Sequence, residues 1–276
     1  MRWLLFFLLF SAIFFGEFVL RDVEVNIGNI QKDGSVHVRE RFRFLVIGDY
    51  EKSLYESGFD RNDLSFWAST TEMSELKLHL NTQVVDIPVA EFAVRPQPLR
   101  NCNNALNLCQ GEITLEYNAY PIYNESDGMP LPRTGLFSIE SPKPRTTRYS
   151  VNPGALAFTT TDQGDPRLEE DVHLVIQLPP HGTVQKEEDL NPKPTGLEDA
   201  RFPVTAEELR WTDMVLVKFT VAFEVEESLD QEVVEFFSDL FKRVERQLQG
   251  EQGMATVLIL LLLLAGYFYL QRFKRG

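Results

Sequence analysis

The sequence predicts a mainly β protein with two antiparallel, immunoglobulin-like (Ig-like) β-sandwich domains, followed by an amphipathic helix and one C-terminal transmembrane helix. Three observations lead to this prediction. Apolar and polar residues alternate over much of residues 18–226, proline and glycine separate the alternating runs, and a charge-free apolar segment lies near the C-terminus. With 276 residues, of which 43% are hydrophobic, the chain is long and apolar enough to form packed interiors.

The strand signals begin with Val23, Val25 and Ile27, which alternate with polar neighbours. A turn signal at residues 32–34 precedes a second alternating run that starts at Val36, so the two runs predict a hairpin. Further alternating runs cover residues 113–117, 172–178 and 215–225, and the last has six apolar residues at every second position. Such runs favour sheets with one dry face. Residues 49–64 lack this period and are expected to form a loop with a helical turn.

The length between the two apolar ends predicts the domain organisation. About 210 residues fit two domains better than one, since domains most often have 100–150 residues. Pro121, Asp127 and Gly128 interrupt the strand pattern. We therefore expect a first sandwich over residues 17–120 and a second over residues 121–226.

The N-terminal residues 1–16 are typical of a secretory signal. Arg2 precedes an apolar run that only Ser11 interrupts before Gly16, and this run is short for a membrane span. A small-x-small cleavage site is poorly defined, so an uncleaved N-terminal anchor and a buried core helix are the alternatives.

Residues 254–270 contain no charge and cover about 25 Å as a helix, near the lower limit for crossing a bilayer. Tyr267, Phe268 and Tyr269 suit the aromatic belt, and a basic tail over residues 271–276 follows. Because positive charge stays cytoplasmic, the segment predicts a single-pass cell membrane protein with its bulk outside and its C-terminus in the cytoplasm.

The charge balance excludes one class of partner. Forty-one acidic residues against 27 basic ones give a net charge of −14, which lacks the basic footprint of a nucleic-acid binder. Solubility explains this acidity most simply, with halophilic solvation and divalent-cation binding as alternatives.

Residues 228–249 predict a juxtamembrane amphipathic helix. Ser228 and Gln231 have the spacing of a capping box, and acidic residues precede basic ones along the segment. The apolar stripe consists of Leu229, Val233, Phe236, Phe237, Leu240, Val244 and Leu248. This stripe would pack on its own domain, on a partner subunit or second copy of the chain, or on the membrane surface.

Two modifications follow from an extracytoplasmic location. Cys102 and Cys109 are the only cysteines, and an even pair seven residues apart predicts a disulfide. Asn124 begins an Asn-Glu-Ser triplet, which is a glycosylation acceptor in a host that glycosylates.

No catalytic or cofactor motif is recognisable, and the protein is expected to be neither an enzyme nor a cofactor binder. The four histidines, His37, His79, His173 and His181, lack the spacing of a zinc site. Asp162 and Asp165 lie in an acidic, glycine-containing turn, for which a solvated turn is the expected structure and a calcium loop the alternative.

Glu40 is in phase with Val38 and Phe42, on the side of its strand assigned to the core, while Arg39, Arg41 and Arg43 point the other way. A carboxylate in a core is costly unless it is paired. Three alternatives follow: a bulge turns Glu40 outward, it forms a buried structural ion pair, or it serves a functional site.

The sequence between Asp22 and Phe42, with its Asp33-Gly34-Ser35 turn and Glu40, resembles the start of uncharacterised prokaryotic membrane proteins with a signal segment and a β-rich extracytoplasmic domain. The phenylalanine-rich leader and acidic ectodomain look archaeal. The layout is also similar to the lumenal part of ribophorin, a non-catalytic oligosaccharyltransferase subunit, although no motif is shared.

These features favour a non-enzymatic, membrane-anchored interaction protein, acting as a scaffold, an adhesion module or an accessory subunit of a membrane complex. One alternative is a carbohydrate- or ligand-binding receptor module, with Trp67, Trp211 or Tyr149 lining a groove. The other is an envelope hydrolase of the glycosidase type with two buried carboxylates in a cleft.

Overall fold

The computed structural model describes residues 17–80, 85, 87–123, 134–143 and 145–226. The chain divides into two compact units, Met1–Glu226 and Glu227–Gly276, and every described residue belongs to the first unit. The predicted signal segment, amphipathic helix, transmembrane helix and basic tail, together with Asn124, lie outside the described residues. The described part is mainly β, as predicted.

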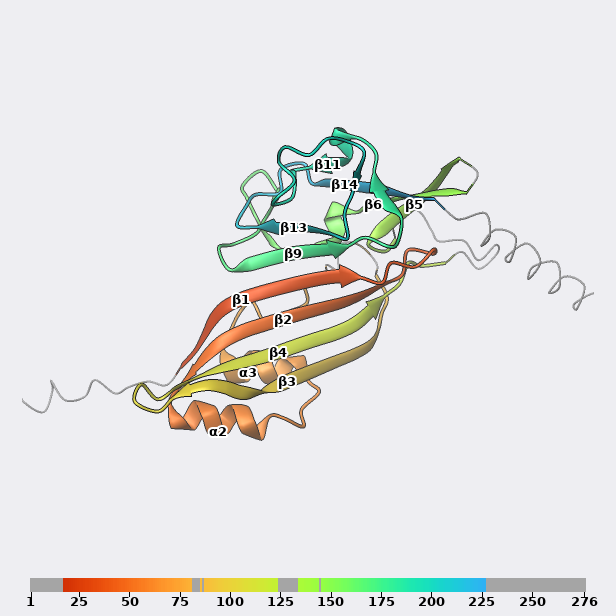
Figure 1. The fold of residues 1–276 in the computed structure, drawn as a ribbon. Coiled ribbons are helices and arrows are strands. Elements are labelled where there is room, and N and C mark those ends of the chain that lie inside the picture. The colour runs from red at the N-terminus through yellow and green to blue at the C-terminus, as the bar shows by residue number, and fades with distance from the viewer. Residues whose placement is uncertain (1–16, 81–84, 86, 124–133, 144, 227–276) are drawn as a thin grey trace, which may run out of the picture. The chain divides into compact units, whose positions relative to one another are not determined.

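The larger sheet, called sheet 1, has six strands (Figure 1). Their order is β13 (Glu208–Thr212), β9 (Val172–Gln177), β1 (Glu17–Gly28), β2 (Val36–Ile47), β4 (Leu108–Ala119) and β3 (Val89–Asn103). Neighbouring strands are antiparallel except for β1 and β9, which are parallel.

The second sheet, called sheet 2, has five strands on its main path. Their order is β12 (Val204–Thr205), β10 (Gly182–Val184), β14 (Thr220–Glu226), β6 (Thr146–Val151) and β5 (Phe137–Lys143), and β11 (Leu190–Asn191) also pairs with β14. A two-stranded sheet of β7 (Thr159–Thr160) and β8 (Pro166–Arg167) and two short 3₁₀ helices, η1 (Pro153–Ala155) and η2 (Glu187–Asp189), complete the elements from residue 134 to 226.

Sheet 1 contains strands from both sides of the boundary predicted at residues 120–121. β9, from the second half of the chain, pairs with β1 over a register that runs from Val23 opposite Val172 to Ile27 opposite Ile176. Leu174 and Val175 point to opposite faces of β9, yet both are fully buried, as is typical of a strand in a parallel pair. Alternation within a strand predicts which face is buried, but it does not determine which strand lies beside it.

The hairpin predicted from the first two runs is formed by β1 and β2. Val23, Val25 and Ile27 are completely buried, and Gly34 closes the connection with a φ of 82°, a conformation that glycine adopts without the cost of a Cβ. The pairing continues without a register shift from β2 into β4. The alternation therefore places one set of side chains in the core and the other in solvent.

The strand predicted over residues 215–225 is shorter than its pattern, because β14 begins only at Thr220. Lys218 has a φ of 48°, which breaks the extended backbone, and Val215 makes only an isolated bridge with Arg167. Val217 is 47% exposed as a result, whereas Leu216 is buried. The sequence prediction was wrong for residues 215–219, because a period of two in apolar residues does not report a turn.

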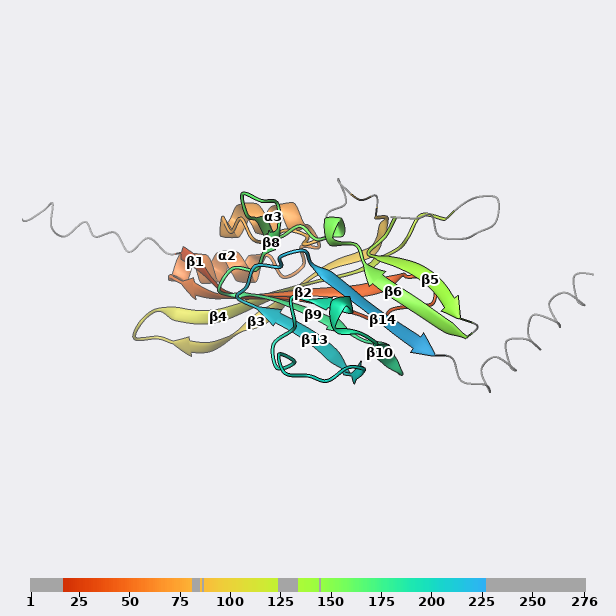
Figure 2. The same ribbon diagram turned by 90° about the horizontal axis from the view of Figure 1, so that it is seen from above.

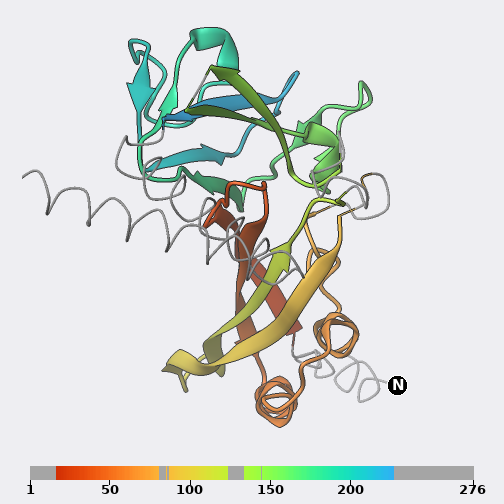
Figure 3. The same ribbon diagram turned by 90° about the vertical axis from the view of Figure 1, so that its right-hand side faces the viewer.

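Helices α2 (Asp49–Ser57) and α3 (Leu64–Thr71) lie on the same side of sheet 1 (Figures 2 and 3). The Asp63 side chain accepts a hydrogen bond from Ser65 and caps α3. Tyr55 and Trp67 are fully buried, and the Tyr55 hydroxyl donates to the carbonyls of Gln97 and Glu112 at 2.7 Å each. Residues 49–64 thus hold a nine-residue helix where only a helical turn was expected. On the opposite face of sheet 1, β1, β2 and β4 carry mostly polar side chains.

The buried apolar residues form one cluster that includes strands of both sheets, among them Val25 and Phe42 of sheet 1 and Tyr149 and Phe223 of sheet 2. The Tyr149 and Phe223 rings stack with centroids 5.2 Å apart. Over the described residues, no helix combines the length and apolar character needed to cross a bilayer.

Candidate functional site

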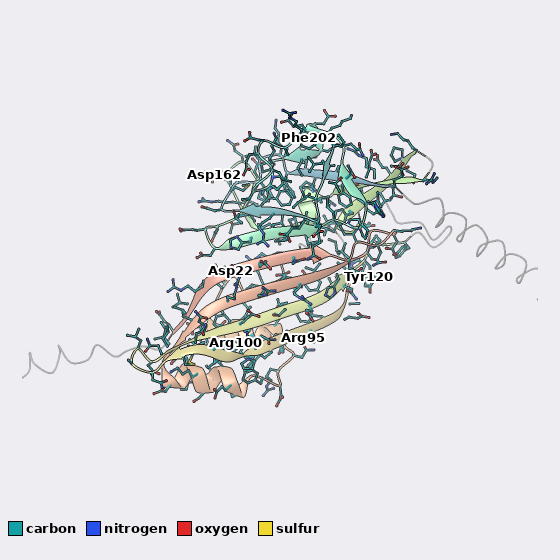
Figure 4. The ribbon with its side chains drawn as sticks, viewed as in Figure 1. Asp22, Arg95, Arg100, Tyr120, Asp162 and Phe202 are labelled. Atoms are coloured by element: carbon teal, nitrogen blue, oxygen red, sulfur yellow. A yellow bond between two sulfur atoms is a disulfide. The ribbon has the colours of Figure 1, made fainter. Side chains whose placement is uncertain are left out.

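The side of sheet 1 opposite the helices carries a dense array of charged side chains, which we call the charged face. It is formed by Asp22, Glu24, Arg39, Arg41, Arg43, Arg95, Glu112, Glu116 and Arg210. These residues alternate along their strands with buried ones such as Val23, Val25 and Phe42, so the strand period itself directs them outward. Figure 4 labels Asp22 on β1, and Arg95 and Arg100 on β3.

Ion pairs that cross the strands hold most of the charged face together. Glu116 lies between Arg39 and Arg95, with a closest nitrogen–oxygen distance of 2.9 Å to each. Glu24 lies between Arg41 at 3.8 Å and Arg210 at 3.3 Å. Each glutamate thus serves two arginines from different strands, which limits the free negative charge on this face.

Asp22 forms a third bridge of this kind. One carboxylate oxygen accepts a hydrogen bond from Arg43 Nε at 2.8 Å, and the other lies 3.2 Å from His173 Nε2. His173 is one of the four histidines that lack the spacing of a zinc site. Its Nε2 has this partner, but its Nδ1 is buried without a hydrogen bond.

A groove of about 400 Å³ opens at one end of the charged face, where Arg21, Arg43 and Arg100 line it. We call it the arginine groove. Two interruptions of the strand ladders build it: β1 shifts register between Leu20 and Asp22, which leaves Arg21 as the extra residue, and β3 shifts register on both sides of Arg100. Such bulges redirect side chains that a regular ladder would place opposite a partner.

Arg21 and Arg100 differ from the other arginines of this face because neither guanidinium has an ion-pair or hydrogen-bond partner among the described residues. Both residues are exposed, and Arg100 pairs across the strands with a neutral residue, Gln110. Two free guanidinium groups in a groove form a locally cationic site on a chain whose net charge is −14. The arrangement suits the binding of an anionic group.

A separate polar cluster lies inside the core, around Glu40. This carboxylate is completely buried, and its Oε1 accepts hydrogen bonds from the His79 backbone N–H at 3.0 Å and from the Tyr117 hydroxyl at 2.5 Å. Its Oε2 lies 2.7 Å from His79 Nδ1. Burial, followed by the charge and the hydrogen bond of Glu40, raises the pKa of Tyr117 well above its ordinary value.

Of the three alternatives for Glu40, the buried pair is the one observed. β2 and β4 keep register throughout, so no bulge turns the carboxylate outward. The ring of His79 lies against Phe42 and Phe158, with centroids 5.9 and 5.3 Å away. The hydrogen bonds of Glu40 join β2, β4 and the segment after α3, and neither Glu40 nor His79 lines the arginine groove.

The described residues contain one other buried carboxylate, Asp189. It pairs with Arg148, which also reaches Glu224 at 3.3 Å, and it accepts a hydrogen bond from the Lys186 backbone N–H. Its partners are different from those of Glu40. The two buried carboxylates are thus held in separate networks.

The disulfide prediction is confirmed: Cys102 on β3 and Cys109 on β4 are bonded across the hairpin that joins these strands. Asp162 is exposed in the β7–β8 turn, and the Asp165 carboxylate accepts a hydrogen bond from the Lys218 backbone N–H at 3.1 Å. Within the described part of the chain, no group of three or more His, Cys, Asp or Glu side chains is placed to hold a metal.

The aromatic residues of the receptor alternative do not line a groove. Trp67 and Trp211 are fully buried and Tyr149 is nearly so, and the Trp211 indole N–H donates to the Pro192 carbonyl at 2.8 Å. Their rings belong to the core cluster.

Arg21 and Arg100 were not predicted as site residues. The outward direction of Arg39, Arg41 and Arg43 follows from alternation, but a bulge has no reliable mark in the sequence. Positions 21 and 100 therefore carried no signal beyond their charge.

No protein-family model matches this chain, and no curated protein matches it. The chemistry of the candidate site therefore rests on its own residues.

Proposed function

We propose that this protein is a non-enzymatic, membrane-anchored interaction protein whose bulk lies outside the cytoplasm and whose charged face contacts a partner. It would act as a scaffold, an adhesion module or an accessory subunit of a membrane complex. The main support is the charged face itself, because Arg39 and Arg95 keep 51% and 63% of their side-chain surface exposed on an ordered sheet.

The disulfide supports the proposed location. Disulfides persist in oxidising compartments and are rare in the cytosol. Cys102 and Cys109 both lie on strands of sheet 1, so the sheet that carries the charged face is the part of the chain that would face the oxidising side.

A second candidate is a ligand-binding surface module, which was the alternative from the sequence. The arginine groove favours it, because Arg21 and Arg100 are free to bind a ligand without breaking an existing ion pair. The two candidate functions are compatible, because a ligand carried by the partner would bind in the arginine groove while the partner contacts the charged face.

Photo-crosslinking in intact cells tests the proposed function. Replacement of Arg95 by p-benzoylphenylalanine places a crosslinker on the charged face, and Glu116 keeps its pair with Arg39. Replacement of Lys186, whose exposed ammonium pairs with Glu188, provides the matched control. We expect a defined crosslinked product from position 95 and none from position 186.

Absence of that product from position 95, combined with a lone monomer recovered from membranes in mild detergent, would refute the proposed function. The same crosslinked species from both positions would show that the charged face is not the contact surface.

A further inference from the structure

We propose that the arginine groove binds an acidic saccharide, with Arg21 and Arg100 each holding a carboxylate of the sugar chain. This inference deepens the proposed function, on which it rests, by assigning a ligand class to one end of the charged face. It starts from the contrast between paired and unpaired arginines on a single sheet.

The arginines of this face with an acidic partner share four carboxylates, from Asp22, Glu24, Glu116 and Glu208. Arg21 and Arg100 lack such a partner among the described residues, and both line the same groove. Planar guanidinium groups bind carboxylates by two parallel hydrogen bonds. A ligand with two carboxylates would therefore supply the acidic partners that Arg21 and Arg100 lack in the protein.

The remaining polar groups of the groove show what else the ligand carries. The amides of Gln97 and Asn101 offer both donors and acceptors, and Asn101 already donates to Gln110 at 2.6 Å. Glu112 also lines the groove, and its carboxylate has no ion-pair partner among the described residues. A carboxylate beside cationic groups repels a purely anionic ligand but accepts hydrogen bonds from hydroxyl groups. Acid groups together with hydroxyl groups are the chemistry of an acidic sugar.

The strand next to the groove argues against an extended peptide. β3 is an edge strand of sheet 1, and Pro96 and Pro98 remove two backbone donors from it close to the groove. Binding by strand addition needs such donors. Leu45 and Pro98 instead offer small apolar surfaces that suit the C–H face of a sugar ring.

Direct binding to the full-length protein in an uncharged detergent tests the proposal. The probe is tetragalacturonate, which carries four carboxylates, and the comparison ligands are neutral maltotetraose and a pentaglutamate peptide, all measured by calorimetry. We expect tetragalacturonate to bind, maltotetraose not to bind, and pentaglutamate to bind at least about tenfold more weakly.

The variants Arg21→Gln and Arg100→Gln break no ion pair, so each should fold normally and weaken tetragalacturonate binding by about tenfold. Arg201→Gln is the matched control, because Arg201 is exposed, has no ion-pair partner among the described residues and does not line the groove. Its affinity should equal that of the wild type.

Three results would overturn the proposal: no binding of tetragalacturonate, equal binding of pentaglutamate, or an equal loss in all three variants. Equal binding of pentaglutamate would assign the groove to acidic peptides. Crosslinking from position 95 is measured separately, so a failure of the groove proposal leaves the proposed function standing and the two failures are distinguishable.

Discussion

At the scale of single residues, Glu40 shows how a charge is kept inside a β core. Its two oxygens are satisfied by His79 and Tyr117, and the aromatic rings of Phe42 and Phe158 enclose the histidine. An unpaired buried carboxylate would be strongly unfavourable, whereas a fully hydrogen-bonded one is tolerated. The network fixes the segment after α3 onto sheet 1.

Removal of the charge at Glu40 tests this role. Glu40→Gln removes the negative charge and replaces one of the two acceptor oxygens by an amide N–H₂ group in a buried site. We expect the free energy of unfolding to fall by about 3 kcal/mol. Urea titration followed by circular dichroism measures it. Tyr117→Phe, which removes one donor and keeps the ring, should cost about 1–2 kcal/mol, and a Glu40→Gln protein as stable as the wild type would contradict the structural role.

Asp33 predicts a pH dependence. Although burial raises its pKa, hydrogen bonds from the Ser35 hydroxyl, the Tyr123 hydroxyl and the Ser35 backbone N–H together lower the pKa below the ordinary value of an aspartate. Burial and then the bond to Asp33 raise the pKa of Tyr123 to about 12, so the phenol remains a donor at neutral pH.

A lowered pKa means that Asp33 stabilises the fold above the unfolded-state pKa and that this contribution disappears as the pH falls through the folded-state pKa. Asp33→Asn should therefore reduce stability at neutral pH and flatten its fall below about pH 4. Unfolding free energies measured across this range test the effect. An unchanged slope in the variant would show that Asp33 does not contribute.

At the scale of elements, the β3–β4 hairpin combines irregular pairing with a covalent link. β3 shifts register at three points, and two of them flank Arg100. The disulfide joins the two strands at the last of these shifts, between Arg100 and Asn103, near the exposed tip at Leu106. The disulfide therefore stabilises the hairpin where the pairing between β3 and β4 is interrupted, next to the arginine groove.

Replacement of both cysteines tests the contribution of this bond. Closing a loop of this size stabilises a fold by about 2 kcal/mol through the lost entropy of the unfolded chain. We expect a Cys102→Ser, Cys109→Ser variant to lose up to this amount in urea unfolding, and dithiothreitol to lower the stability of the wild type but not of the variant. An equal response of both proteins to dithiothreitol would contradict the assignment.

At the scale of the whole molecule, the first compact unit depends on contacts between distant parts of the chain. β1 pairs with both β2 and β9, which lie far apart in sequence, and the buried cluster includes both sheets. Sheet 1 is therefore incomplete without residues 172–212.

This dependence predicts cooperative unfolding. A fragment of residues 17–226 should unfold in urea as one transition, since removing β9 and β13 exposes the edge of β1 and part of the core. A fragment of residues 17–120 should fail to give a cooperative transition. Two separate transitions in the longer fragment would instead support the two independent domains expected from the sequence.

The sequence by itself determined the β class, the first hairpin, the pairing of Cys102 with Cys109 and the outward direction of Arg39, Arg41 and Arg43, because each follows from local alternation or from the count of cysteines. Only the tertiary structure decided that β9 joins β1, that His79 and Tyr117 satisfy Glu40, and that Arg21 and Arg100 line one groove. Strand periodicity reports which face of a strand is buried. The neighbour of a strand and the side chain opposite a bulge depend instead on contacts between residues far apart in the chain.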